Sequence, residues 1–219
     1  MSRTESTYSC HRFKSNYSCK DFCTTHVIQI KSYLIAICLL FLYSSGFSQI
    51  KYEKELRLKE RYVPQSAIQF VEGLGFEKKI KWYKEIGINK SSIEAKTKSN
   101  RKKYSIEFNV AGELEDVEIE IKQKEIPQDV NQRISLELSN RYGKYKIQKI
   151  QIQYLGEESH MIPFISENRE KDYIQTNYEI VLKTKVKGSF KQFEYLFSDE
   201  GAFIHFAEIV TKNRDNIEY

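Results

Sequence analysis

From residue 50 onward, the sequence repeats one order of local patterns, and this repeat is the strongest constraint on its fold. In each copy a short pair, Val63-Pro64 or Ile126-Pro127, stands before apolar residues at helical spacing. Proline is well tolerated at the start of a helix because the missing N–H would be unpaired there. Segments that alternate between apolar and polar residues follow each helix, as in strands with one buried face.

Turn residues separate the alternating segments, as expected for antiparallel strands. The second copy differs from the first by a longer connection, residues 157–176. The predicted strands cover residues 80–85, 93–98, 104–110, 117–121, 145–155, 178–186, 190–197 and 203–210. We predict an α+β fold of two tandem units, each a helix packed on a four-stranded antiparallel sheet, over residues 49–122 and 123–212.

An uncharged apolar run at residues 33–43 precedes the repeat. It is shorter than the roughly 20 residues of a membrane span, and small residues at Gly46 and Ser48 suit a signal peptidase. We predict a signal peptide over residues 31–48, cleaved after about Ser48, and a periplasmic or secreted mature chain. The alternative is a single N-terminal membrane anchor. Residues 1–30 are either a leader or the result of an incorrectly assigned translation start.

Removal of the signal peptide would change the chemistry of the chain. All four cysteines, Cys10, Cys19, Cys23 and Cys38, lie before residue 49. The full chain has 35 basic and 30 acidic residues, and most of the basic excess also lies before residue 49. The nearly balanced remainder gives no electrostatic case for nucleic acid. We predict another envelope protein or peptide as partner, no nucleic acid, and no stable membrane span after processing.

Several motifs of the first copy resemble one family. The matching residues are the Val-Pro start, Lys81-Trp82-Tyr83-Lys84-Glu85, Ile93-Glu94-Ala95-Lys96 and Tyr104-Ser105-Ile106-Glu107-Phe108 before Ala111-Gly112-Glu113-Leu114. They resemble the PepSY-like proteins of Bacteroidota, which are also described as resembling the β-lactamase inhibitor protein. The resemblance spans about residues 50–210, and the second copy lacks a match to Trp82. It implies an exported tandem α+β protein. Relatives of the inhibitor fold bind proteins on a concave sheet, and PepSY domains are thought to restrain peptidases.

Residue parity along the strands predicts two faces for the first sheet. The apolar parity, which includes Trp82, is expected to face the helix; it contains Ile93, Ala95, Tyr104, Ile106, Phe108, Val117, Ile119 and Ile121. The opposite parity gives an open face of mixed charge: Lys81, Tyr83, Glu94, Lys96, Lys98, Ser105, Glu107, Asn109, Glu118 and Glu120. That face is either solvated or a docking surface.

The second copy has apolar residues on both parities of its last strands: Phe190, Phe193, Tyr195, Leu196, Phe197, Phe203, Ile204 and Phe206. Strands that are apolar on both faces are either covered or part of an interface. Either a partner binds here, or residues 157–176 fold over the surface. Our candidate binding residues are Lys81, Tyr83, Lys96, Lys98, Glu107, Leu196 and Phe206.

Catalytic motifs are absent from the sequence, which has no P-loop, no HExxH and no nucleophile elbow. The acidic run from Glu113 to Glu120 lacks the spacing of an EF-hand, which favours a solvated strand. We predict no catalytic residue, no metal ligand and no cofactor. The predicted function is an exported, non-enzymatic binding or inhibitory module that acts through its β-sheet surface. The alternative is an envelope structural or small-ligand-binding protein.

Overall fold

Three α-helices and one β-sheet make up the part of the chain that the computed structural model describes, residues 49–88, 90–167 and 173–211. The helices are α2 (Gln65–Gly73), α3 (Gln128–Arg141) and α4 (Glu158–Glu167). None of these helices is long and apolar enough to cross a membrane. The predicted signal peptide and residues 1–30 lie outside the described residues, so cleavage after Ser48 stays a prediction.

A single ten-stranded sheet runs through this part of the chain. Its order is β1-β10-β9-β8-β7-β6-β5-β4-β3-β2, and all pairs except the parallel β1–β10 pair are antiparallel. Single-turn 3-10 segments, Glu60–Tyr62 and Gln123–Glu125, precede α2 and α3. The strands are β1 (Gln49–Glu53), β2 (Glu55–Leu58), β3 (Lys81–Ile86), β4 (Ser91–Ser99), β5 (Lys102–Asn109), β6 (Leu114–Glu120), β7 (Tyr145–Leu155), β8 (Gln175–Val186), β9 (Ser189–Ser198) and β10 (Phe203–Thr211).

The predicted α+β class is confirmed, with one large mixed sheet and helices on its outside. Strands β3 to β6 follow α2, and strands β7 to β10 follow α3. Hydrogen bonding continues from β6 to β7, where Val117 lies opposite Tyr154, so the strands form one sheet. The layout of two separate four-stranded units therefore stays a prediction.

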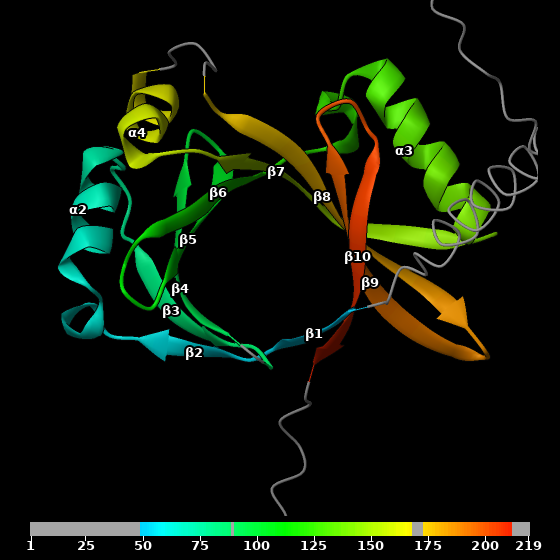
Figure 1. The fold of residues 1–219 in the computed structure, drawn as a ribbon, viewed down its shortest axis with the longest axis horizontal. Coiled ribbons are helices and arrows are strands. Elements are labelled where there is room, and N and C mark those ends of the chain that lie inside the picture. The colour runs from blue at the N-terminus through cyan, green and yellow to red at the C-terminus, as the bar shows by residue number, and fades with distance from the viewer. Residues whose placement is uncertain (1–48, 89, 168–172, 212–219) are drawn as a thin grey trace, which may run out of the picture. The chain divides into compact units, whose positions relative to one another are not determined.

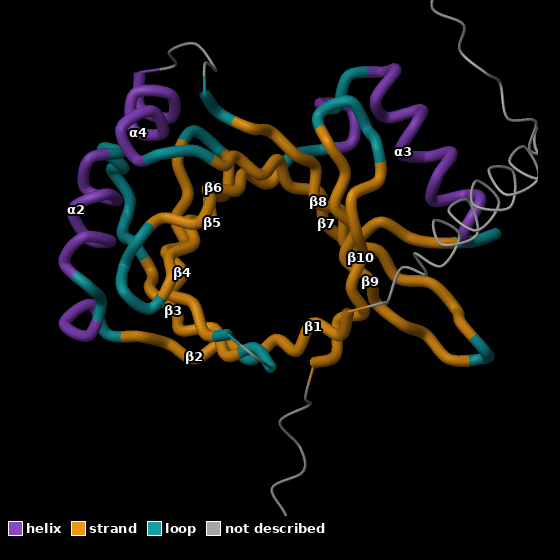
Figure 2. The backbone as a smooth tube through the Cα atoms, in the orientation of Figure 1, coloured by secondary structure: helices purple, strands orange, loops and turns teal. Residues whose placement is uncertain are grey.

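The two edges of this sheet are joined by one short stretch of chain. Strand β1 pairs with β10 at one edge, β2 pairs with β3 at the other, and only Lys54 separates β1 from β2. The Ile86 N–H donates a hydrogen bond to the Lys54 carbonyl at 3.0 Å, so the pairing has no gap on this side. We call residues 49–58 the closing segment, because they complete the ring of strands seen end-on in Figure 2. The sheet thus has an inner and an outer face.

The outer face carries the apolar parity of the strands, as predicted. Trp82, Phe108 and Ile106 are buried against α2 in the first core. Val130, Ile134 and Leu138 of α3 are buried against β7 to β10 in the second core. The helices lie outside the ring in Figure 1. The outer parity thus supplies the hydrophobic burial that is the main driving force for folding.

The described part of the connection at residues 157–176, which includes helix α4, does not cover the second sheet. Its helix α4 lies beside α2, and Met161, Ile162 and Phe164 pack into the first core. A Cβ added to Gly73 of α2 would lie 3.2 Å from Ile162 Cδ1, so the two helices approach closely. The interpretation that this connection folds over β9 and β10 is therefore wrong. Its apolar residues are used to extend the first core instead.

Candidate functional site

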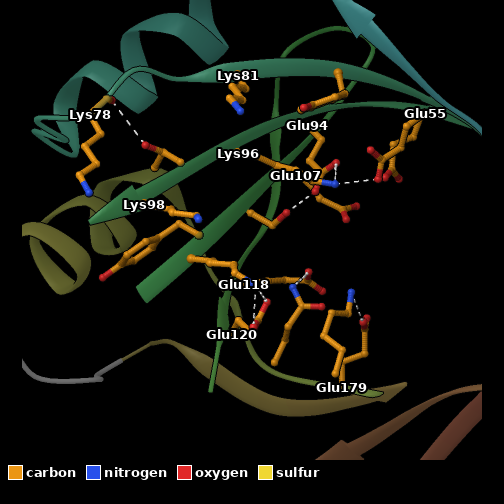
Figure 3. Close-up of a pocket in the computed structure, with 18 of the residues that line it drawn as sticks. Glu55, Lys78, Lys81, Glu94, Lys96, Lys98, Glu107, Glu118, Glu120 and Glu179 are labelled. Carbon is orange, nitrogen blue, oxygen red and sulfur yellow. Dashed lines mark hydrogen bonds and ion pairs between the residues drawn. The ribbon is translucent and has the colours of Figure 1, made fainter. Parts of the chain in front are cut away.

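The inner face of the sheet surrounds a cavity of about 540 Å³. Five of the candidate residues predicted from the sequence line it (Figure 3): Lys81, Tyr83, Lys96, Lys98 and Glu107. Strands β3, β4 and β5 position them, because inner-facing residues occur at every second position of a strand. Small-molecule sites commonly have volumes of about 300–1,000 Å³, so this cavity is large enough for a small ligand.

The two candidates from the second copy lie elsewhere. Leu196 of β9 pairs with Glu179 but does not line the cavity. Phe206 of β10 packs against the second core, where its ring stacks on Tyr195 with centroids 5.2 Å apart. The structure therefore does not bring these two residues together with the other five.

Several carboxylates of the inner face are buried, contrary to the interpretation of a fully solvated face. Glu94 is 3% exposed and Glu118 is 5% exposed. The acidic strand β6 was also predicted to be solvated, yet Asp116 is only 8% exposed. The physical reason is the closing segment, because its pairing at both edges of the sheet makes the face concave and encloses it.

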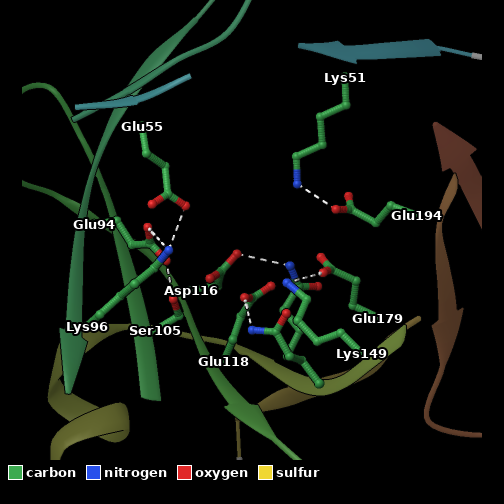
Figure 4. Close-up of polar contacts among 12 residues, drawn as sticks. Lys51, Glu55, Glu94, Lys96, Ser105, Asp116, Glu118, Lys149, Glu179 and Glu194 are labelled. Carbon is green, nitrogen blue, oxygen red and sulfur yellow. Dashed lines mark hydrogen bonds and ion pairs between the residues drawn. The ribbon is translucent and has the colours of Figure 1, made fainter. Parts of the chain in front are cut away.

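Lysines are paired with some of these carboxylates (Figure 4). Lys96 Nζ lies 2.7 Å from Glu55 Oε1 and 2.9 Å from Glu94 Oε2. Burial alone would lower the pKa of Lys96, but these two carboxylates outweigh it and raise the pKa. The Ser105 hydroxyl donates a hydrogen bond to Glu94 as well. The Lys96 pairs join the closing segment to β4.

Two further ion pairs lie on the opposite side of the ring. Lys51 Nζ of the closing segment lies 2.6 Å from Glu194 Oε2 of β9. Lys149 Nζ of β7 lies 3.6 Å from Glu179 Oε1 of β8. The closing segment is thus tied through charged side chains to both halves of the sheet.

Burial and like charge disturb the acids of the inner face. Burial, with a contribution from Glu94, raises the pKa of Glu85 to about 7. Burial, with contributions from Glu179 and Glu115, raises the pKa of Asp116 to about 7 against the hydrogen bond from Gln153. Burial and the neighbouring carboxylates also raise the pKa values of Glu107 and Glu118. Perturbed acids that line a concave site are typical of functional sites.

A group of exposed lysines lines one end of the cavity, and we call Lys78, Lys79, Lys81 and Lys98 the lysine mouth. Figure 3 shows Lys78, Lys81 and Lys98 at this end. Among the described residues, none of the four forms an ion pair. Neighbouring Lys103 differs from them, because its Nζ lies 2.8 Å from Glu120 Oε2. The mouth is thus a concentration of positive charge without acidic partners in the described part of the chain.

Sequence reasoning missed the cavity residues that come from distant strands. The missed charged residues on these strands are Lys51, Glu55, Lys149 and Glu179. A signal was present for some of them, because charged residues occupy the parity opposite to the apolar one in the segments at 50–58 and 145–155. The missing information was that both segments face the same enclosed space.

Comparisons with known proteins find similarity in structure alone. No protein-family model matches the sequence, and no curated protein matches it. A DUF2874-family protein from Bacteroides ovatus is 11% identical, with a TM-score of 0.46, covering 67% of this chain and 87% of its own. A BLIP-like protein from Bacteroides fragilis is 14% identical, with a TM-score of 0.44 and coverages of 70% and 91%. A proposed periplasmic protein from Bacteroides eggerthii is 11% identical, with a TM-score of 0.45 and coverages of 67% and 89%.

Proposed function

We propose that the chain is an exported, non-enzymatic binding protein that holds a small anionic molecule at the lysine mouth of its cavity. The observation that carries this proposal is the gathering of Lys78, Lys79, Lys81 and Lys98 on one cavity, with no ion pair among the described residues. Like charges in a concave site repel one another and attract a counter-charge. An anionic group in the mouth would relieve that repulsion.

The cavity favours a small ligand over a folded partner. A docking surface for a folded protein needs an open sheet face, and the closing segment pairs with both edges of this sheet. A molecule that fits within about 540 Å³ can enter where the lysines are exposed. The proposal therefore keeps the predicted binding role on the sheet but replaces the open docking surface with a cavity.

Two aromatic rings on the cavity wall suit such a ligand. Tyr83 and Tyr104 both line the cavity near the lysine mouth. Tyr83 already stacks under two cations, with Lys96 Nζ 5.2 Å and Arg57 Cζ 5.0 Å from its ring centroid. The lining is otherwise mostly charged, so these two rings offer the apolar surface against which the organic body of a ligand can pack. The proposed ligand is a carboxylate or phosphate attached to a small organic body.

A binding experiment tests the proposal. We would titrate citrate, inorganic phosphate and an uncharged sugar into the purified protein by calorimetry, at low and at high salt. Binding of an anion that weakens with salt is expected, because salt screens exposed charges. The double variant Lys81→Gln, Lys98→Gln should bind at least about tenfold more weakly, a difference of about 1.4 kcal/mol.

The matched control is Lys124→Gln, Lys144→Gln, which removes the same charge from two exposed lysines that do not line the cavity. It should bind as the wild type does. Equal loss in both double variants would show that net charge alone attracts the anion and would contradict the proposed site. Absence of any anion binding by the wild type would also overturn it.

Two finer relationships belong to the same proposal. We infer that strands β3 to β10 derive from two duplicated helix-and-four-strand units, since each helix follows a proline cap, Pro64 or Pro127. The hairpin glycines support this inference, because Gly112 approaches the start of α2 and Gly201 approaches Val130 of α3. The resemblance to PepSY-like proteins stays part of this proposal.

A further inference from the structure

Three carboxylates gather at a point of the inner face away from the lysine mouth. Glu107 of β5, Asp116 of β6 and Glu118 of β6 each offer an oxygen, and these oxygens lie within 4.8 Å of one another. The register explains the grouping: Glu107 lies directly opposite Asp116, and Glu118 is the next residue of β6 on the same face. Three acids so close together repel one another when they are ionised.

Two buried oxygens in the same region have no hydrogen-bond partner. Asp116 Oδ1 is one, although Asp116 Oδ2 accepts a hydrogen bond from Gln153 Nε2 at 2.9 Å. The second is Oε1 of Gln151, a cavity-lining residue that is 5% exposed. Gln151 Nε2 donates to Glu118 Oε2 at 2.5 Å, so the amide group of Gln151 lies beside one carboxylate of the cluster. A buried acceptor without a partner costs roughly 1–3 kcal/mol, so a cation that both oxygens could bind would offset that cost.

The nearby lysines are already paired with other carboxylates. Lys96 pairs with Glu94 and Glu55, Lys149 with Glu179, and Lys51 with Glu194. None of the ion pairs between described residues includes Glu107, Asp116 or Glu118. Figure 4 shows Asp116 and Glu118 between two sets of ion pairs, those of Lys96 on one side and that of Lys149 on the other. The three carboxylates therefore lack a neutralising cation of their own.

We propose that Glu107, Asp116 and Glu118, together with the carbonyl oxygen of Gln151, bind a hard divalent cation such as Ca²⁺. All of the donors are oxygens, which are the ligands that Ca²⁺ and Mg²⁺ prefer. Side chains from β5, β6 and β7 surround the point, and Ca²⁺ tolerates such irregular geometry better than Mg²⁺ does. A cation here would satisfy both partnerless oxygens and remove the repulsion among the acids.

The site does not depend on the anion proposed for the lysine mouth, because it uses different residues. The acidic run of β6 alone gave no reason to expect it: Glu107 lies on the neighbouring strand, and Gln151 follows about thirty residues later in the chain. Only the sheet register and the enclosed inner face bring the four residues together.

Calorimetry and thermal unfolding of the chelator-treated full protein test the cation site, with Ca²⁺, Mg²⁺ and Mn²⁺ as separate probes. Ca²⁺ should bind with heat and raise the Tm of the wild type, with a Kd on the order of 0.1–1 mM, as in extracellular modules. Asp116→Asn and Glu118→Gln should each bind at least about tenfold more weakly, because each removes a direct ligand charge. Their Tm should no longer respond to Ca²⁺.

A matched control is Glu115→Gln, on the same strand, whose carboxylate lies 2.5 Å from Lys90 Nζ and outside the cluster. It should respond to Ca²⁺ as the wild type does. Without the cation, Asp116→Asn and Glu118→Gln should unfold at or above the Tm of the wild type, since repulsion is removed. A variant whose Tm no longer responds to Ca²⁺, but whose Tm without the cation is not lowered, has therefore lost a ligand of the cation and has not misfolded. No response of the wild type to any of the three cations, or an unchanged response in both cluster variants, would overturn the proposal.

Discussion

The two faces of the one sheet are built on opposite principles. On the outer face, Phe108 is completely buried and packs against Phe70 of α2, with ring centroids 5.7 Å apart. On the inner face, the adjacent residue Glu107 joins a group of carboxylates that no helix covers. Hydrophobic burial stabilises a fold, whereas buried charge at best offsets its own desolvation. Stability should therefore come from the outer face, and the inner face should carry function.

The largest expected change in the free energy of unfolding comes from a comparison of one residue on each face. Phe108→Ala should lower the free energy of unfolding by about 3–5 kcal/mol, because it leaves a cavity in the first core. Glu118→Gln on the inner face should leave the free energy of unfolding unchanged or raise it. Urea denaturation of both variants at neutral pH with chelator measures the two changes. Comparable destabilisation by both would break the contrast between the faces.

The attachment of α2 to the outer face should give the next largest effect. A Cβ at Gly112 would lie 2.4 Å from Ser66 Oγ and 2.5 Å from Pro64 Cβ, at a φ of +87°. Gly188 has a similar φ of +89° but nothing within 4 Å of such an atom. Gly188→Ala should cost about 1 kcal/mol through the backbone alone. Gly112→Ala should cost clearly more, and equal costs in urea denaturation would show that this close approach contributes nothing.

The stability of the folded protein should depend on pH because of the buried acids on the inner face. In the folded protein the pKa values of Asp116 and Glu85 are raised to about 7. Below the ordinary carboxyl pKa values both the folded and unfolded states are protonated. Between the ordinary carboxyl pKa values and about pH 7, the unfolded chain releases protons that the folded protein keeps. The free energy of unfolding therefore falls as pH rises. With chelator present, the Tm should fall by at least about 2 °C from about pH 5 to about pH 8.

Asp116→Asn is the variant that sharpens this pH test, because it removes one of the two groups. Its Tm should fall less steeply over the same range, whereas Glu72→Gln, a change at an exposed acid of α2, should follow the wild type. A wild-type Tm that rises over this range would mean that the inner carboxylates are not buried as described.

The smallest effect is expected for an ion pair on the outside of the molecule. Arg133 Nη2 lies 2.9 Å from Asp129 Oδ2, one turn apart on α3, and both side chains are largely exposed. Such a pair contributes about 0.3–0.5 kcal/mol, so a double-mutant cycle with alanine should give a coupling in that range. A coupling above about 1 kcal/mol would show that charge pairs also stabilise the outer surface substantially.

Local sequence patterns predicted the strands and their faces because each depends on neighbouring residues. The predicted strand at residues 145–155 matches β7, and Trp82 faces the core as its parity requires. Closure of the sheet could not be predicted in this way. It depends on the pairing of β1 with β10, in which Lys51 lies opposite Ile209 although most of the chain separates the two residues in sequence. No alternation within one segment carries that information, so the mixed-charge face was expected to be open, either solvated or a docking surface.

The candidate site shows the same limit. Lys81, Tyr83, Lys96, Lys98 and Glu107 were found because they share one local parity. Their counterparts on other strands could not be combined with them without the register of the full sheet. The apolar residues of β9 and β10 divide between the two faces. Phe193, Tyr195 and Phe197 are buried in the core with α3, whereas Phe190 and Ile204 are exposed.

Cysteine labelling tests the enclosure of the inner face most directly. Ser105 is a small, buried residue of β5 that lines the cavity, whereas Ser139 of α3 is exposed. With the four native cysteines replaced by serine, Ser105→Cys and Ser139→Cys would each be treated with a bulky polymer-linked maleimide and with a small alkylating reagent. We expect the bulky reagent to label the Ser105→Cys protein far more slowly than the Ser139→Cys protein, and the small reagent to react with both. Equal rates with the bulky reagent would contradict a closed ring of strands and with it the enclosed site.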